Sequence, residues 1–153
     1  MLGYLDDATA TAHALKRHRD GRVWLHTGDL GHRDADGYFY FHVRLKRMIK
    51  SSGFNVYPAQ VEAVLLKHPL VSEACVVGVP DAEQVERVVA CVVPAAGAAG
   101  DGEAHRLIAH CRENLIKWSC PREIRFCASL PKTRVGKIDY RVVQREAERA
   151  AHA

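Results

Sequence analysis

Two runs of β-branched residues constrain the fold of this chain more than any other feature of its sequence. Residues 74–79 and 88–93 are almost entirely apolar, and a polar connection through residues 80–83 separates them. Valine-rich runs of this length, with a Pro-Asp turn signal between them, are typical of adjacent strands. We therefore predict that both runs lie at the centre of a sheet. Residues 122–127 have the composition of a third strand.

Helical patterns surround these strands. One begins at Pro58 and is stopped by His68 and Pro69, a second covers residues 103–117, where Asp101 helps the start, and a charged helix covers residues 139–150. An Ala/Gly-rich linker over residues 94–102 precedes the second helix. From residue 51 onward the chain therefore predicts a compact α+β unit with a sheet of about three strands and flanking helices. The residues expected on the inward faces of the first two helices are Val61, Val64, Leu65, Leu107, Ile108, Cys111 and Leu115.

The first residues of the chain predict a weakly packed helix. Asp6 or Asp7 is a suitable cap for a helix over residues 8–16, whose alanines and threonines bury little apolar surface. The basic cluster at residues 16–19 is interpreted as the polar end of this helix. Such a segment is too small to fold alone.

A hairpin is predicted next. Residues 24–30 contain a strand followed by a turn, and residues 34–37 form a second turn before the alternating strand at 37–41. The apolar face of this hairpin has no partner within the sequence, and we therefore expect residues 1–43 to be the tail of a larger domain. Its apolar residues are Trp24, Leu25, Leu30, Phe39 and Phe41.

Composition argues against several classes of protein. Of the 153 residues 26% are charged and the net charge is +4, which is ordinary and not typical of a dedicated nucleic-acid binder. No apolar run approaches the roughly 20 residues of a membrane span, and the amino terminus has no signal pattern. Five cysteines without a CxxC pair indicate reduced, buried thiols. We therefore predict a cytoplasmic protein without a nucleic-acid partner or a membrane span.

Metal and phosphate motifs are not predicted. His105, His110 and Cys111 fall on one predicted helix, but the histidine spacing differs from the i, i+4 zinc pattern and no carboxylate accompanies it. The chain also has no GxSxG element, no GK[ST] loop and no GxGxxG after a strand. We therefore predict no metal site and no triphosphate cradle within this sequence.

Three short elements carry chemistry, and their order is informative. The first is Thr27-Gly28-Asp29, where a carboxylate on a glycine turn can accept two hydrogen bonds from a vicinal diol such as ribose. The second is the basic segment 44–53, Arg-Leu-Lys-Arg-Met-Ile-Lys-Ser-Ser-Gly, which joins two structured regions. The third is the exposed loop 130–138, in which Lys137 follows a glycine. Taken singly, the first element is consistent with an ordinary turn, the second with a solvated connector and the third with a surface lysine.

In this order, the three elements resemble the carboxy-terminal third of the adenylate-forming superfamily, specifically the acyl-CoA synthetases or fatty-acid CoA ligases. The resemblance runs along residues 3–5, 24–31, 34–38, 44–58 and 130–138. It implies a small lid domain that closes over a large amino-terminal domain and rotates between two half-reactions. The implied boundaries are 1–43 for the tail of the amino-terminal adenylate-binding domain, 44–50 for the hinge and 51–153 for the carboxy-terminal domain.

The resemblance also implies roles in nucleotide chemistry. Asp29 is expected to hold the ribose hydroxyls of ATP and acyl-adenylate, with Arg44 supporting the same nucleotide. Lys46 occupies the position of the hinge residue. Lys137 is expected to be the adenylation lysine, whose ammonium bridges the carboxylate nucleophile and the α-phosphate.

A second set of residues is expected to serve CoA. Ser51, Ser52 and Gly53 are implied to face the pantetheine channel after rotation, since glycine permits close approach of the backbone. The complete enzyme would convert a carboxylic acid, ATP and CoA into acyl-CoA, AMP and diphosphate, with Mg²⁺. We expect none of these molecules to bind this chain tightly by itself, and we expect the chain alone to be inactive.

Departures from the family pattern leave alternatives open. Val43 stands where Gly or Asp is usual, Gln60 where Glu is common, and Val85 where Gly is common. A fragment of an adenylation domain that loads a carrier protein would share the same motifs, although the sequence Asn-Val-Tyr-Pro at residues 55–58 favours free CoA as the acceptor. The alternative that is not an enzyme function is a stand-alone docking module that binds a separate amino-terminal partner.

Overall fold

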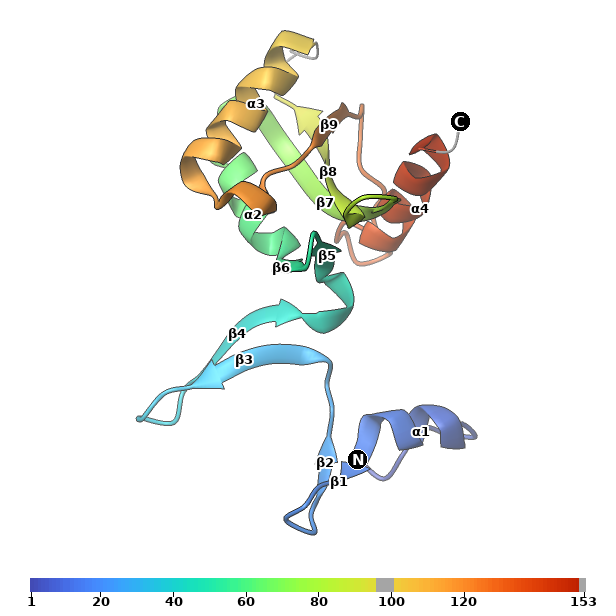
Figure 1. The fold of residues 1–153 in the computed structure, drawn as a ribbon. Coiled ribbons are helices and arrows are strands. Elements are labelled where there is room, and N and C mark those ends of the chain that lie inside the picture. The colour runs from blue at the N-terminus through green and yellow to red at the C-terminus, as the bar shows by residue number, and fades with distance from the viewer. Residues whose placement is uncertain (96–100, 152–153) are drawn as a thin grey trace. The chain divides into compact units, whose positions relative to one another are not determined.

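The structure, a computed structural model, describes residues 1–95 and 101–151. The chain divides into two compact units, Met1–Lys46 and Arg47–Ala153 (Figure 1). Most of the linker predicted over residues 94–102 lies outside the described residues, because only its two ends are described.

The larger unit is built on a five-stranded sheet in the order β6-β5-β8-β7, with β9 also pairing with β8. Strands β7 (Val71–Asp81) and β8 (Val85–Pro94) are antiparallel, and β9 (Glu123–Phe126) runs parallel to β8. The three predicted strands are therefore confirmed, but only β8 is central and β7 lies at the edge. The predicted number of about three strands is too low, because two short strands also join the sheet.

The first of these two strands comes from the basic segment 44–53, which joins two structured regions, and the second follows it directly. A 3-10 helix, η1 (Leu45–Arg47), is followed by β5 (Ile49–Ser51), which pairs with β6 (Phe54–Val56) and meets β8 through Ser51. Ile49 is 2% exposed, so its burial in the core brings this segment into the sheet. The end of the segment is thus part of the folded unit.

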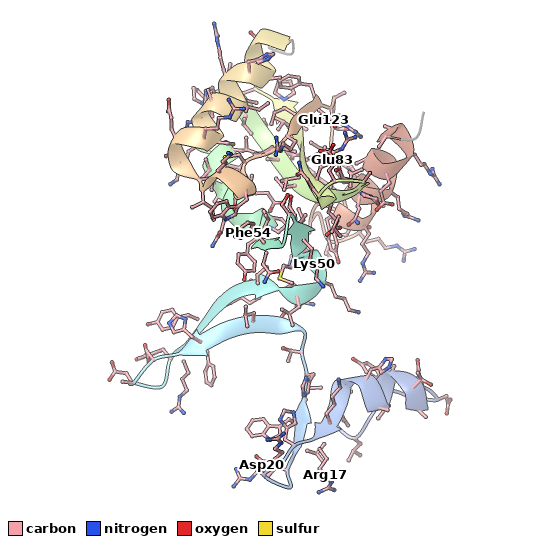
Figure 2. The ribbon with its side chains drawn as sticks, viewed as in Figure 1. Arg17, Asp20, Lys50, Phe54, Glu83 and Glu123 are labelled. Carbon is pink, nitrogen blue, oxygen red and sulfur yellow. The ribbon has the colours of Figure 1, made fainter. Side chains whose placement is uncertain are left out.

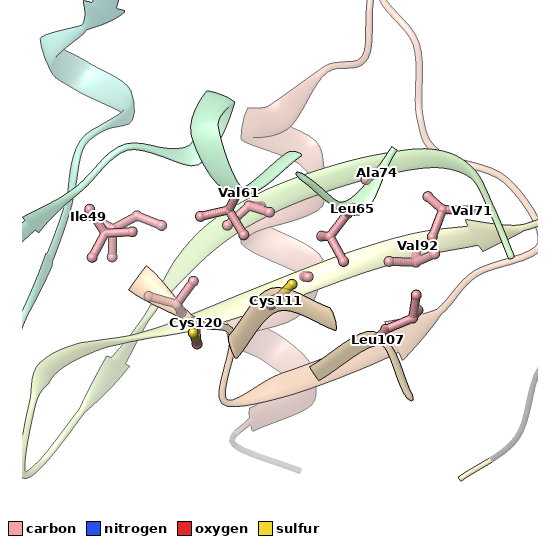
Figure 3. Packing of buried hydrophobic residues seen from close by; sticks show 13 residues of the cluster. Ile49, Val61, Leu65, Val71, Ala74, Val92, Leu107, Cys111 and Cys120 are labelled. Carbon is pink, nitrogen blue, oxygen red and sulfur yellow. The ribbon is translucent and has the colours of Figure 1, made fainter. Parts of the chain in front are cut away.

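Helices cover both faces of this sheet. Ala74 and Val92 face the core that contains α2 (Pro58–Leu65) and α3 (Asp101–Asn114), as the close view of this cluster shows (Figure 3). Cys75 and Val77 face the opposite core, to which α4 (Tyr140–Ala151) contributes. A sheet buried on both faces requires strands that are apolar at successive positions. The continuous runs in the sequence are therefore explained by helices on both sides.

The helices of this unit agree closely with their sequence patterns. Val61, Leu65, Leu107 and Cys111 have no exposed surface, and Pro58 lies at the start of α2 as predicted. The Asp139 carboxylate accepts the Arg141 N–H at 3.2 Å just before α4, as a helix cap does. A second 3-10 helix, η2 (Lys117–Ser119), connects α3 to β9.

The smaller unit begins with α1 (Ala8–Ala14), and the Asp7 carboxylate accepts the Ala10 N–H at 2.7 Å. The prediction that this helix extends to residue 16 is wrong. Leu15 is extended and pairs with Leu25, so that β1 (Leu15–Arg17) forms a hairpin with β2 (Val23–Leu25). Part of the basic cluster therefore lies on a strand rather than at a helix end.

The single hairpin predicted for residues 24–41 is also incorrect, because two separate pairs of strands form. β3 (Asp29–Arg33) pairs with β4 (Phe39–Arg44), whereas β2 pairs with β1. Gly28, with φ of +78°, turns the chain between β2 and β3. Phe39 is 84% exposed and Phe41 67% exposed within this structure, as the expected apolar face requires.

Two further predictions concern reduced thiols and membrane-spanning helices. All five cysteines are free thiols, four of them buried and Cys127 half-buried, which agrees with the predicted reduced thiols. Within residues 1–95 and 101–151, no helix is long and apolar enough to cross a membrane.

Candidate functional site

Asp29 and Arg44 form an ion pair in the smaller unit. They are opposite one another in the β3–β4 register, which places their side chains on one face. Arg44 Nε lies 2.8 Å from Asp29 Oδ1, and Arg44 Nη2 donates to Oδ2 at 3.3 Å. A guanidinium that engages both oxygens of a carboxylate fixes the plane of that carboxylate. The structure therefore brings these two predicted nucleotide residues together.

An open cavity of about 720 Å³ lies beside Asp29 in the same unit. Thr27, Gly28 and Lys46 contribute to its lining, together with Trp24 and His26. Thr27 Oγ1 accepts the Asp29 N–H at 3.2 Å, and the Gly28 carbonyl accepts the Leu45 N–H at 2.8 Å. The turn at Gly28 is thus held from both sides, and it presents one carboxylate to a space large enough for a nucleoside.

Lys137 lies in the larger unit, on the loop between β9 and α4. Gly136 has φ of +77° and donates its N–H to the Thr133 carbonyl at 2.9 Å, which makes a tight turn just before the lysine. The Lys137 side chain is exposed, and no ion pair with it occurs among the described residues. This geometry presents a free ammonium group to solvent at the tip of a closed loop.

Ser51, Ser52 and Gly53 form the turn between β5 and β6. Ser52 has φ of +50° and Gly53 φ of +81°, the combination that a two-residue type I′ hairpin turn requires. Gln84 holds this turn, since its carbonyl accepts the Ser52 N–H at 2.9 Å and its side-chain oxygen accepts the Ser51 hydroxyl at 3.3 Å. The turn is therefore held by the residue that directly precedes β8.

A cavity of about 220 Å³ borders this turn, and it contains residues that sequence reasoning missed. Phe54, labelled in Figure 2, stacks on Trp118 with ring centroids 4.2 Å apart and planes 8° from parallel. Lys117 and Arg122 line the same cavity. The available signal was an exposed tryptophan flanked by cations, but its proximity to the serine turn depends on the tertiary fold.

A neighbouring cavity of about 370 Å³ shares Lys117 and Arg122 with the cavity of about 220 Å³, and Arg112 also lines it. No acidic partner pairs with these three cations within the part of the chain that the structure describes. Unpaired cations around a hollow attract phosphate groups. The two cavities together offer an aromatic ring, a polar turn and positive charge.

Arg47, immediately after Lys46, is held in the larger unit. Its guanidinium donates to both carboxylate oxygens of Glu62 and lies 5.0 Å from the centre of the Tyr140 ring. Glu62 Oε1 also accepts the Val76 N–H at 2.9 Å. These contacts tie the residue after the predicted hinge to α2, β7 and α4.

Three thiols meet on the sheet face that packs against α4. Cys75 lies opposite Cys91 in the β7–β8 register, and Cys127 follows β9. A hydrogen bond from Cys91 lowers the pKa of Cys127 to about 7, and the same bond raises the pKa of Cys91. Burial raises the pKa of Cys75 to about 12. Cys127 is thus the thiol most readily ionised near neutral pH.

Histidine, cysteine and carboxylate side chains do not gather into a metal-binding group of three or more within residues 1–95 and 101–151. His110 and Cys111, which the sequence places on one helix, have structural contacts rather than a metal-binding arrangement. His110 Nε2 lies 3.1 Å from the Val64 carbonyl, and Cys111 is fully buried.

Comparison with known proteins identifies what this arrangement is similar to. The family model for the AMP-binding enzyme C-terminal domain matches residues 60–137. The sulfoacetate–CoA ligase of Cupriavidus necator is 44% identical over 138 residues, which is 90% of this chain and 26% of that protein. The long-chain-fatty-acid–CoA ligase of Bacillus subtilis is 42% identical over 149 residues, 97% of this chain and 25% of that protein. The chain thus spans about a quarter of the length of these curated relatives.

Solved structures give the same result. MatB from Rhodopseudomonas palustris with ATP bound aligns with a TM-score of 0.83 and 32% identity, over 95% of this chain and 28% of that chain. The o-succinylbenzoate CoA synthetase MenE from Bacillus subtilis, in complex with the acyl-adenylate intermediate, aligns with a TM-score of 0.76 and 33% identity, over 93% of this chain and 28% of that chain.

Proposed function

Because this chain belongs to the family of AMP-binding enzyme C-terminal domains, we propose that it is the carboxy-terminal part of an ATP-dependent acyl-CoA ligase. The complete enzyme would join a carboxylic acid to ATP, release diphosphate, and then transfer the acyl group from AMP to the thiol of CoA. The observation that carries this proposal is the occurrence of a paired Asp29, an unpaired loop lysine and a cationic cavity in one chain of this family.

The first half-reaction would use Asp29, Arg44 and Lys137. The Asp29 carboxylate, oriented by Arg44, accepts hydrogen bonds from both ribose hydroxyls of the nucleotide. The Lys137 ammonium bridges the attacking carboxylate and the α-phosphate. It thereby offsets repulsion between two anions and stabilises the charge that builds up in the transition state.

The second half-reaction would use the turn at Ser51–Gly53 and the two cavities beside it. The Phe54–Trp118 stack offers a flat surface on which the adenine of CoA can lie. Lys117, Arg122 and Arg112 provide charge for its phosphates. The thiol arm would then run along the serine turn, where Gly53 leaves the backbone accessible.

Lys46 is proposed to be the hinge between the half-reactions. The proposed boundaries are those that the resemblance implies: 1–43 for the amino-terminal adenylate-binding domain, 44–50 for the hinge and 51–153 for the moving domain. The division of the structure after Lys46 falls within this hinge. Arg47 is fixed to Glu62 in the larger unit, which favours a change of backbone angles just before it. The complete enzyme would use Mg²⁺ together with ATP, and we assign this ion to no residue of this chain.

Transfer to a carrier protein is the competing enzyme function. We favour CoA because the cationic and aromatic cavities suit a nucleotide with phosphate groups. A non-catalytic docking module remains the alternative from another class. In either case the chain is expected to act with an adenylate-binding amino-terminal domain, whether joined to it or separate.

Exchange of ATP with diphosphate tests this proposal. The 153-residue chain alone should show no acid-dependent exchange, because it provides only part of the nucleotide site. Joined to the amino-terminal portion of the Bacillus subtilis ligase, it should restore exchange with fatty acids, followed by consumption of CoA thiol. Clear exchange by the chain alone would contradict its dependence on another domain. Exchange without any thiol consumption in the joined protein would contradict the CoA assignment.

A further inference from the structure

The loop that carries Lys137 is closed by one residue, Thr133. The Thr133 N–H donates to the Lys137 carbonyl at 2.7 Å, and the Thr133 hydroxyl accepts the Lys137 N–H at 3.3 Å. Lys132 and Ile138 form an antiparallel bridge just outside this pair. Both main-chain polar groups of Lys137 are therefore held by Thr133, while its side chain is exposed.

An ion pair anchors the same loop to the sheet. Lys132 Nζ lies 2.6 Å from Oε1 of Glu73, which belongs to β7, with side chains 49% and 30% exposed. The Asp139 N–H donates to the Pro131 carbonyl at 2.8 Å, and Leu130 is buried in the core beneath α4. The loop is thus fixed at its base, at its side and across its tip.

The energetics of this ion pair point to a role other than stability. A pair between side chains this exposed contributes little to folding, because water already solvates both groups well. It does, however, restrict where the loop lies over the edge of β7. Restricting the loop matters for a lysine, since its stem of four carbons is flexible and the protein can fix only its backbone. A displacement of about 1 Å at a reacting group can lower a rate roughly a hundredfold.

We infer that Thr133 and the Glu73–Lys132 ion pair are positioning groups that hold the backbone of Lys137 where its ammonium meets the reacting phosphate. This inference rests on the proposed adenylation function. None of the three residues is assigned to touch substrate. Each acts through the loop, and their loss should therefore affect only the step that uses Lys137.

Hydrogen exchange on the 153-residue chain tests the geometric part. In Thr133→Val, the amide of Lys137 loses its acceptor, and exchange in the peptide 133–138 should be at least about tenfold faster. Thr133→Ser keeps the hydroxyl and should exchange like the original chain. Unchanged protection in Thr133→Val would overturn the role of this hydroxyl.

The enzymatic part is tested in the joined protein described above. Thr133→Val should lower kcat for adenylation by roughly tenfold, with little change in KM for ATP. Glu73→Gln should lower kcat by up to about fivefold, because an exposed ion pair of about 1 kcal/mol can bias the position of the loop by no more than that factor. Thioester formation from preformed acyl-AMP should keep its rate. Thr133→Ser keeps the hydroxyl and should keep most of the adenylation activity. The double variant Glu73→Lys with Lys132→Glu re-forms the ion pair with reversed charges and should recover most of the activity that Glu73→Gln loses.

The matched control is Arg87→Met. It removes an ion pair of similar exposure on the neighbouring strand, where Arg87 lies 3.4 Å from Glu123, and it should leave both half-reactions unchanged. Full adenylation in Lys137→Ala would overturn the proposed function itself. Loss of adenylation in Lys137→Ala but not in Thr133→Val or Glu73→Gln would overturn only the positioning role. Equal slowing of both half-reactions by Thr133→Val would also overturn it, because general damage would then explain the loss.

Discussion

Val85 lies opposite Ser51 where β5 meets β8, and it holds a φ of +69° at that position. A β-branched residue in the left-handed region is strained by roughly 1–2 kcal/mol, because its Cβ approaches the neighbouring carbonyl oxygen. Its side chain is 67% exposed, so little packing offsets this strain. This position is also one of the departures from the family pattern noted in the sequence, where glycine is common.

Val85→Gly should therefore stabilise the larger unit. Relief of strain exceeds the entropy that glycine loses on folding, and we expect the free energy of unfolding to rise by about 0.5–1 kcal/mol. Gly53→Ala is the opposite control, because Gly53 has φ of +81° and alanine would be strained there. Urea unfolding of both variants measures the difference. A lower midpoint for Val85→Gly would show that its backbone conformation is not a source of strain.

Arg44→Met should separate binding from stability. Arg44 is 57% exposed, and its pair with Asp29 contributes only about 0–1 kcal/mol to folding, so thermal unfolding of the chain should hardly change. In the joined enzyme, however, Asp29 would lose its orienting partner and KM for ATP should rise about tenfold. Arg44→Lys keeps the charge but not the two-point contact, and its KM for ATP should lie between those of the original enzyme and Arg44→Met. An unchanged KM for ATP in Arg44→Met would contradict the nucleotide role of this pair.

Lys137→Ala and Lys46→Pro should fail at different steps of the joined enzyme. Loss of the Lys137 ammonium should slow acyl-AMP formation by orders of magnitude and spare thioester formation from synthetic acyl-AMP. Proline at residue 46 fixes φ near −65° and should impair the thiol step, because the hinge cannot reach its second conformation. Diphosphate release and loss of CoA thiol measure the two steps separately. Equal slowing of both steps by Lys137→Ala would argue against domain alternation.

Alkylation by iodoacetamide should select Cys127 and depend on pH. The hydrogen bond from Cys91 lowers the pKa of Cys127 to about 7, so its reactive thiolate fraction rises with pH and is half-maximal near pH 7. Burial raises the pKa of Cys75 to about 12, and this thiol should stay unmodified through pH 9 in the folded chain. Peptide mass spectrometry locates the label. Cys91→Ser weakens the hydrogen bond and should shift the Cys127 profile to higher pH, whereas an unshifted profile would contradict this cause.

Hydrogen exchange should divide the chain into two regions of different stability. The larger unit has two buried clusters and should protect β7 and β8 strongly. The smaller unit consists of one short helix and two-stranded sheets with exposed aromatic side chains, such as Phe39 and Phe41, and should exchange rapidly or associate with itself. Dilution distinguishes the two outcomes, since only self-association depends on concentration. Strong and uniform protection of residues 4–41 in a monomer would contradict the proposed boundary.

Most local elements of the larger unit, and the family of the chain, could be predicted from the amino-acid sequence. Valine runs predicted β7 and β8, helical spacing predicted α2 and α3 with their inward faces, and the ordered motifs led to the family that the comparisons confirm. These features are local, because the alternation of apolar residues and the preferences for caps and turns act over a few residues.

Strand pairing and the contacts between distant side chains could not be predicted from the sequence and came from the three-dimensional fold. It made β8 central, brought β5 and β6 into the sheet, and separated the predicted single hairpin into two. It also placed Trp118 against Phe54 beside the serine turn, although the two aromatic residues are far apart in the sequence. Strand pairing and cavity formation depend on contacts between distant residues, whose free energy is gained only when the whole unit packs, and no local pattern records them.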